Sequence, residues 1–273
     1  FEKALAIYDP TQHRDDSFLY ALNPGVAMPC FAAWALWCSG RPDHALERIE
    51  AALTLARELS EPQGLAHAAL FASVLYQFRR DTLMAQYYAE AVIDISREHG
   101  LALYGAMAQI MQAWALSKYG GGRLAVDQIR EGLAALDATG TFLVRPHFLA
   151  LLAEVFSKIN EIEEALLLLD EAMAIVNSKG ERYYEAELYR LRGELLLKVN
   201  QGNAEDCFRR SLAIAESQKA KAWQLRTALS LARLYRSQGK VVEARNLVAP
   251  IYESFTEGFE TDDLRDAGVL LQT

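Results

Sequence analysis

The stretch Ala153-Glu-Val-Phe-Ser-Lys-Ile-Asn-Glu-Ile-Glu-Glu-Ala-Leu-Leu-Leu-Leu-Asp-Glu-Ala172 decides the fold. It places a large apolar residue, Phe156, three positions after the small Ala153, then a turn residue, Asn160, and then a second small residue, Ala165. Side-chain size at the contact sets how closely two helices approach, so alanine on both helices permits tight packing. This order predicts a first helix, a tight turn and a second helix packed against the first.

The same order recurs about every 40 residues along the chain. The small residue of the first helix recurs at Ala33, Ser73, Ala113, Ala153, Gly193 and Ala232. The small residue of the second helix recurs at Ala45, Ala85, Ala125, Ala165, Ala204 and Ala244. The turn between the helices recurs at Gly40, Arg80, Gly120, Asn160, Asn200 and Gly239, mostly residues that tolerate the left-handed conformation closing a helix. The spacing predicts an all-α protein, a right-handed α-solenoid of about six helix-turn-helix repeats.

The repeats divide the chain into three parts. Residues 1–23 are expected to hold the end of a preceding repeat helix plus a connector, and whether residues 9–24 are ordered remains open. Residues 261–273 are expected to form a C-terminal capping segment. Because the chain starts at Phe1, inside a helical pattern in which Ala4 takes the position of Ala172, we expect it to be a piece of a longer protein. The six repeats are expected at 24–61, 62–100, 101–140, 141–180, 181–220 and 221–260.

Composition and charge restrict the classes of partner. The formal net charge is −8, which disfavours nucleic acid and anionic membranes as partners. No apolar run approaches the roughly 18 residues of a membrane span. Cys30 and Cys38 lie eight residues apart on one expected helix, about 12 Å and too far to bridge, and Cys207 leaves the cysteine count odd. These features predict a cytoplasmic protein that binds neither nucleic acid nor a membrane.

Motifs for catalysis, cofactors or metals are missing from the sequence. Gly120-Gly-Gly-Arg-Leu has no Lys-Ser or Lys-Thr at phosphate-loop spacing, so it is expected to be a turn between helices. A serine or cysteine nucleophile is recognised by geometry, and no local pattern supports one here. We therefore expect no catalytic residue, no cofactor and no metal site, and a chain that is not an enzyme. The five histidines are scattered, at His13, His44, His67, His99 and His147.

The repeat pattern is similar to that of a known family. The positions Ala153, Phe156, Ala165, Leu169 and Ala172 resemble the tetratricopeptide repeat. The chain departs from that family in two ways, because the period is about 40 rather than 34 residues and the consensus Trp and closing Pro are mostly absent.

A narrower resemblance covers most of the chain. It is seen in Leu5-Ala-Ile-Tyr-Asp-Pro-Thr-Gln-His-Arg, in Asn23-Pro-Gly-Val and in Ala33-Trp-Ala-Leu-Trp. It is seen again in Arg145-Pro-His-Phe-Leu-Ala-Leu-Leu-Ala-Glu and in the stretch that begins Gly180-Glu-Arg-Tyr-Tyr-Glu-Ala-Glu. These stretches are similar to the C-terminal repeat region of bacterial signalling ATPases, which are often fused to a class III adenylate or guanylate cyclase domain. The resemblance implies a sensor or scaffold arm of a larger signalling protein.

The expected binding surface is the concave face of the first helices. Counted from each small residue, offsets −6, −3, +1, +4 and +5 point to this face, which is aromatic in the first three repeats and charged in the last three. Aromatic anchors with a charged rim suit an amphipathic helix or an extended peptide. The expected partner is a protein segment or another domain of the parent chain. The candidate contact residues are Trp34, Trp37, Phe78, Met107, Trp114, Lys158, Arg190, Lys198, Arg233 and Arg236.

Several alternatives stay open at this point. The tryptophans either line the groove or pack in the core. The arginines Arg226, Arg233 and Arg236 either hold a carboxylate or phosphate or are paired with Glu187 and Glu194, and pairing is favoured. The favoured function is a non-catalytic interaction scaffold. The alternatives are a small-molecule effector sensor using the aromatic face, and self-association through the ends of the repeats.

Overall fold

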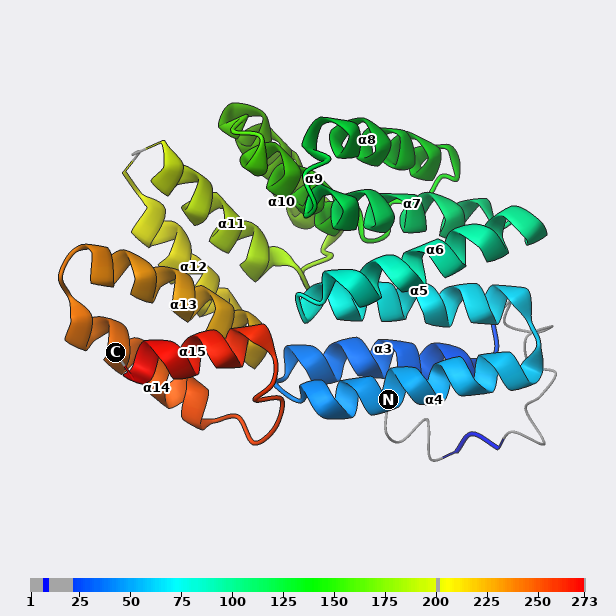
Figure 1. The fold of residues 1–273 in the computed structure, drawn as a ribbon, viewed down its shortest axis with the longest axis horizontal. Coiled ribbons are helices and arrows are strands. Elements are labelled where there is room, and N and C mark those ends of the chain that lie inside the picture. Colours follow the sequence, from blue (N-terminus) through cyan, green and yellow to red (C-terminus); the bar gives the residue numbers. More distant parts are fainter. Residues whose placement is uncertain (1–6, 10–21, 200–201, 273) are drawn as a thin grey trace. The chain divides into compact units, whose positions relative to one another are not determined.

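Helix pairs follow the repeat register of the sequence. The computed structural model describes residues 7–9, 22–199 and 202–272, and in these residues it contains thirteen helices and no strand. The predicted all-α fold of helix-turn-helix repeats is therefore confirmed (Figure 1). The expected helix end around Ala4, most of the connector and the turn residue Asn200 lie outside the described residues.

The chain divides into two compact units. The first unit includes the described residues up to Trp37 and Arg41–Thr141, and the second includes Cys38–Gly40 and the described residues from Phe142 onward. The helices assigned to the first unit are α3 (Pro24–Cys38, whose last residue is grouped with the second unit), α4 (Pro42–Leu59), α5 (Pro62–Phe78), α6 (Thr82–His99), α7 (Ala102–Ser117) and α8 (Gly122–Ala138). The helices of the second unit are α9 (Arg145–Lys158), α10 (Ile162–Lys179), α11 (Glu185–Lys198), α12 (Ala204–Ser217), α13 (Lys221–Ser237), α14 (Val241–Glu253) and α15 (Asp262–Gln272).

The first helices of successive repeats contact one another as well as their own partners. In the first unit α5 contacts α7, and in the second unit α9 contacts α11, α11 contacts α13, and α13 contacts α15. Helix α15 thus follows α13 in the same way as α13 follows α11. The first helices of the second unit and α15 therefore form one continuous layer.

The small residues lie where the two helices of a repeat cross. Ser73 Oγ donates a 2.7 Å hydrogen bond to the backbone oxygen of Ala85, which directly joins the two small positions of that repeat. At Gly193 an added Cβ would lie 2.6 Å from Cε1 of the buried Phe208. The spacing of small residues therefore reflects close backbone packing, as the sequence predicts.

Left-handed residues close the helices at the expected turns. Asn160 has a φ of 64°, and Arg80, which lacks the usual glycine or asparagine, has a φ of 66°. Lys219, between α12 and α13, also has a positive φ, of 56°. None of the described helices combines the length and apolarity needed to cross a bilayer.

Candidate partner-binding face

The aromatic half of the predicted face is largely buried. The side chains of Trp37, Phe78, Met107 and Trp114 are at most 6 % exposed. The rings of Trp37 and Phe78 pack with centroids 4.9 Å apart, which accounts for part of this burial. Because so little of their surface is accessible, these four side chains offer little area to a partner, and their role as contact residues stays a prediction.

Trp34 differs from these four residues because it is only half-buried. Its Nε1 donates a 3.0 Å hydrogen bond to the backbone oxygen of Phe71, and the two rings stack with centroids 4.1 Å apart. Phe31 packs edge-on against Phe71, and its own side chain is exposed. The first unit thus retains a small aromatic surface at Phe31 and Trp34.

The charged half of the face is built around a buried carboxylate on α11. Glu187 is 2 % exposed and accepts two 2.7 Å hydrogen bonds from Arg190, one from Nε and one from Nη2. Burial by itself lowers the pKa of Arg190, but the charge and hydrogen bonds of Glu187, with the charge of Glu194, more than offset it and raise that pKa. Arg190 therefore stays charged, and the bidentate pair fixes its orientation.

The ion pair between Glu187 and Arg190 is linked to further charged residues on α13 and α15. Arg226 donates from Nε and Nη2 to Oδ2 of Asp263, at 2.9 and 2.5 Å, and its Nη1 lies 3.9 Å from Oε1 of Glu187. Ser230 Oγ donates a 2.6 Å hydrogen bond to Oε1 of Glu194. The network of Glu187, Arg190, Glu194, Arg226, Ser230 and Asp263, here called the ion-pair cluster, joins three helices of the layer.

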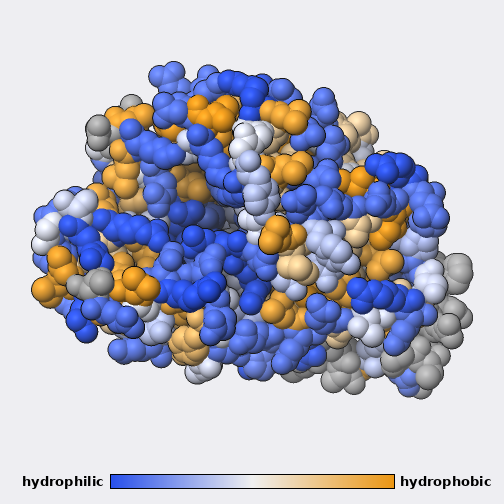
Figure 2. Space-filling view, in the orientation of Figure 1, coloured by the Kyte–Doolittle hydropathy of each residue, from blue (hydrophilic) through white to orange (hydrophobic). Residues whose placement is uncertain are grey.

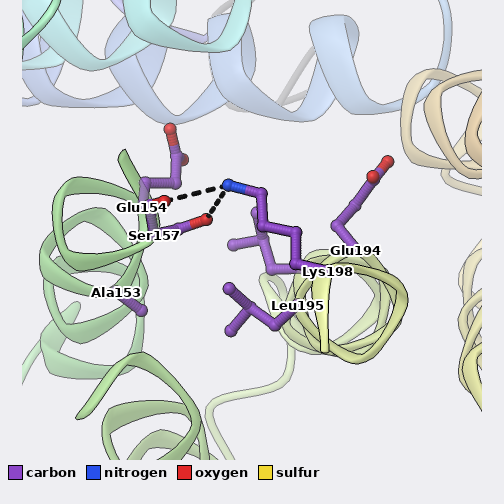
Figure 3. A pocket seen from close by; sticks show the side chains of 7 residues that line it. Ala153, Glu154, Ser157, Glu194, Leu195 and Lys198 are labelled. Atoms are coloured by element: carbon purple, nitrogen blue, oxygen red, sulfur yellow. Dashed lines mark hydrogen bonds between the residues drawn. The ribbon is translucent and has the colours of Figure 1, made fainter. Parts of the chain in front are cut away.

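A first hollow lies between α9 and α11, with a volume of about 230 Å³. Lys198 crosses it from α11, and its Nζ donates to the backbone oxygen and to Oγ of Ser157 at 2.9 and 2.7 Å (Figure 3). Its lining residues are Ala153, Glu154, Ser157, Leu191, Glu194, Leu195 and Lys198.

A second hollow lies between α13 and α15, with a volume of about 390 Å³. Arg233 Nη2 donates a 3.1 Å hydrogen bond to Oδ2 of Asp266 on its rim. Its lining residues are Leu229, Arg233, Arg236, Asp266, Val269 and Leu270. In the space-filling view, hydrophilic side chains predominate over the region of α11, α13 and α15, with apolar patches between them (Figure 2).

The structure places the charged candidates unequally. Lys198 lines the α9–α11 hollow, Arg233 and Arg236 line the α13–α15 hollow, and Arg190 lies in the ion-pair cluster. Lys158 is exposed in the last turn of α9 and lines neither hollow.

The favoured pairing of the arginines is confirmed for Arg226, which lies 3.9 Å from Glu187. Arg226 makes a shorter contact, of 2.5 Å, with Asp263. Sequence reasoning missed Asp263 and Asp266, because α15 lies beyond the six repeats. The separation of 37 residues between Arg226 and Asp263, close to one repeat, is the signal that points to α15. Within the described part of the chain, no group of three or more His, Cys, Asp or Glu side chains could hold a metal ion.

Comparisons with known proteins give relatives of the fold. No protein-family model matches the chain. An uncharacterized protein of Rhizobium meliloti (strain 1021) is 25 % identical over 209 residues, which is 74 % of this chain, and the chain spans only 20 % of that relative's length. A crystal structure of a Rap protein complexed with Competence and Sporulation Factor has a TM-score of 0.59 at 14 % identity, over 91 % of this chain and 73 % of the Rap chain.

A crystal structure of the apo form of RapI is a second structural neighbour. Its TM-score is 0.51 at 15 % identity, over 90 % of this chain and 95 % of RapI. At such identities the likeness shows the fold alone. The chain therefore shares a helical-repeat fold with the Rap proteins.

Proposed function

We propose that this chain is a non-catalytic protein–protein interaction module, the sensor or regulatory arm of a larger bacterial signalling protein. Its partner is a protein segment or another domain of the parent chain, and not a nucleic acid or a membrane. The observation that supports this proposal most directly is the pair of hollows on the layer of α9, α11, α13 and α15, each lined by leucines and charged side chains. The proposed setting is the cytoplasm.

The two hollows combine the features from which such surfaces gain affinity and specificity. The exposed side chain of Val269 offers apolar area to a partner at the α13–α15 hollow, and the charged side chains around both hollows supply specificity. The ion-pair cluster holds Arg190 and Glu194 in place before any partner arrives. A surface held in place in advance loses less side-chain freedom on binding, which favours affinity.

The comparisons are compatible with this proposal. The Rap protein of similar fold was crystallised in complex with Competence and Sporulation Factor, so at least one protein of this fold has a bound partner in its crystal structure. The relative from Rhizobium meliloti is about five times longer than the matched part, which fits a module within a longer protein.

A small-molecule sensor is the second candidate function. The exposed ring of Phe31, beside the Trp34–Phe71 stack and 5.9 Å from the ring of His67, favours it because such a surface suits a flat or apolar effector. This candidate places binding in the first unit, whereas the interaction module places it in the second unit.

Panning a displayed library of random 12-residue peptides on the whole chain tests the proposal. Selected peptides should bind the wild type and lose binding when Glu154→Lys and Arg233→Glu are combined, because each substitution reverses a charge in the lining of one hollow. They should bind Arg210→Glu unchanged, because this substitution reverses an exposed charge on α12, away from both hollows. Peptides that bind the combined variant as well as the wild type would contradict the proposed face. Sedimentation at several protein concentrations checks for self-association in the same samples.

A further inference from the structure

We propose that the segment recognised by the second unit carries a basic group and an acidic group about five or six residues apart, the basic group seated in the α9–α11 hollow and the acidic group in the α13–α15 hollow. This inference rests on the proposed function and specifies the chemistry of the partner. It is drawn from the opposite charges of the two hollows and from their separation.

The α9–α11 hollow has an excess of negative charge. Its lining includes the carboxylates of Glu154 and Glu194 and one cation, Lys198, whose ammonium donates to both oxygens of Ser157. Figure 3 shows Glu154 and Glu194 on opposite sides of the Lys198 side chain.

Glu194 is the better-defined acceptor of the two. Arg190 and Ser230 both donate to its Oε1, and its side chain is 37 % exposed. The other oxygen, Oε2, is therefore available to accept a hydrogen bond from a basic group that enters the hollow. Because the carboxylate is already held by Arg190 and Ser230, its position is fixed before the partner binds.

The α13–α15 hollow has an excess of positive charge. Its lining includes two arginines, Arg233 and Arg236, and one carboxylate, Asp266. The arginines are three residues apart on α13 and thus share a face of the helix. Arg233 contacts Asp266 through Nη2, and its side chain is more than half exposed. A guanidinium group presents several donors in one plane and suits a carboxylate, so this hollow fits an acidic group.

The separation of the hollows sets the spacing in the partner. Helices α9, α11, α13 and α15 contact one another in that order, so the midlines of the α9–α11 and α13–α15 pairs are two helix spacings apart. Neighbouring helix axes lie about 8–10 Å apart, which gives roughly 16–20 Å between hollows. An extended chain advances about 3.3 Å per residue, so the two charges lie about five or six residues apart.

The apolar lining indicates the rest of the segment. Leu191 and Leu195 at the first hollow, and Leu229 and Leu270 at the second, are at most 8 % exposed and close the base of each hollow. Val269, which is 62 % exposed beside the second hollow, is the side chain that an apolar residue next to the acidic group of the partner covers. A partner with its charges exchanged would bring like charges together at both ends, which disfavours that orientation.

Labelled synthetic peptides with blocked ends test the inference on the whole chain. The reference 12-residue peptide has Lys at its fourth position, Glu at its ninth position, and leucines beside each charge. A second peptide has the same composition with Lys and Glu adjacent. Fluorescence anisotropy should show binding at least about tenfold weaker for the second peptide, because only one of its charges can reach a matching hollow at a time.

A variant with reversed charges in the α13–α15 hollow provides the decisive comparison. The double variant Arg233→Glu and Arg236→Glu should bind the reference peptide at least about tenfold more weakly and should prefer a peptide with Lys in place of its Glu. Arg210→Glu makes the same kind of charge reversal outside both hollows and serves as the control. Thermal melts of all variants check folding. Equal affinity for the two peptide spacings, or no gain for the exchanged peptide, would overturn the inference.

Failure of this inference can be distinguished from failure of the proposed function. If library-selected peptides need Glu154 and Arg233 but show no regular charge spacing, the interaction face stands and the spacing is wrong. If no selected peptide depends on these residues, both proposals are wrong.

Discussion

At the scale of single residues, Gly193 shows how the repeat depends on side-chain volume. It lies on α11, where a Cβ would meet the buried ring of Phe208 at 2.6 Å. Gly193→Ala gains helix propensity, but the overlap with Phe208 should lower the free energy of unfolding by about 1–3 kcal/mol, as measured by urea denaturation. Gly268→Ala on α15, whose Cβ would lie 3.6 Å from the Tyr252 hydroxyl, should instead raise stability slightly. Stabilisation by both substitutions would contradict this account of packing.

The ion-pair cluster makes a second prediction. Glu187 is buried between Arg190 and Arg226, so Glu187→Ala leaves two buried guanidinium groups without this carboxylate. The loss of stability should be about 3 kcal/mol. Arg265→Ala, which removes an exposed partner of Asp262 on α15, should change the midpoint of chemical denaturation very little. Similar losses of stability for the two variants would show that the ion-pair cluster contributes no more than an exposed ion pair.

Two buried histidines predict how stability depends on pH. Burial lowers the pKa of His67 from its ordinary value of 6.5 to about 4, and that of His147 to about 3. The unfolded chain therefore binds more protons than the folded chain below pH 6.5, so stability falls as pH falls from 6.5 towards 4.

Each histidine should contribute a slope of about 1.4 kcal/mol per pH unit in that window. His67→Phe keeps an aromatic ring against Phe71 and should remove one such slope in urea titrations between pH 6 and pH 4.5. Parallel pH profiles for His67→Phe and the wild type would refute this expectation.

Residue-level contacts were only partly predictable from the sequence. The pairing of Arg226 with Glu187 follows from register, because both lie on the same face of successive first helices. The burial of Trp114 does not follow, because register assigns a side chain to a face but not the atoms that cover it. Asp263 was missed because the repeat pattern stops before α15, while the physical layer continues through it.

At the scale of elements, the second helices of the repeats mostly end on a left-handed glycine, and Ser60 and Lys219 are two residues that depart from this rule. The repeats that end at Gly100, Gly140 and Gly180 close their second helix with a left-handed glycine, and Lys219 takes the equivalent position with a φ of 56°. A residue with a Cβ is strained in this conformation.

Lys219→Gly should therefore raise the free energy of unfolding by about 1 kcal/mol, seen as a higher thermal midpoint. Gln238 follows α13 with a φ of −91°, so Gln238→Gly gains no such relief and should be neutral or destabilising. A lower midpoint for Lys219→Gly than for the wild type would mean that its side chain stabilises the turn more than the strain costs.

The order of helices and turns was the most predictable level of structure. The observed pairs, such as α9 and α10, follow the small residues and turn residues of the sequence because those positions are fixed by backbone contact. The two hollows were not predictable, since a hollow depends on how far neighbouring first helices separate, which no single helix encodes.

At the scale of the whole molecule, the two units differ in the surface that they offer. The first unit buries Trp37, Phe78, Met107 and Trp114 of its predicted face, whereas the second unit presents two charged hollows beside the ion-pair cluster. This difference supports the proposal that the second unit holds the main binding face. A net charge of −8 is compatible with it, because the local arginines of α13 and not the total charge decide what the α13–α15 hollow attracts.

The most direct test of the central claim is hydrogen–deuterium exchange of the whole chain with and without a library-selected peptide. We expect slower exchange in α9, α11, α13 and α15, and no change in α3 and α5. Slower exchange confined to α3 and α5, around Phe31 and Trp34, would contradict the proposed face and favour the small aromatic site of the first unit.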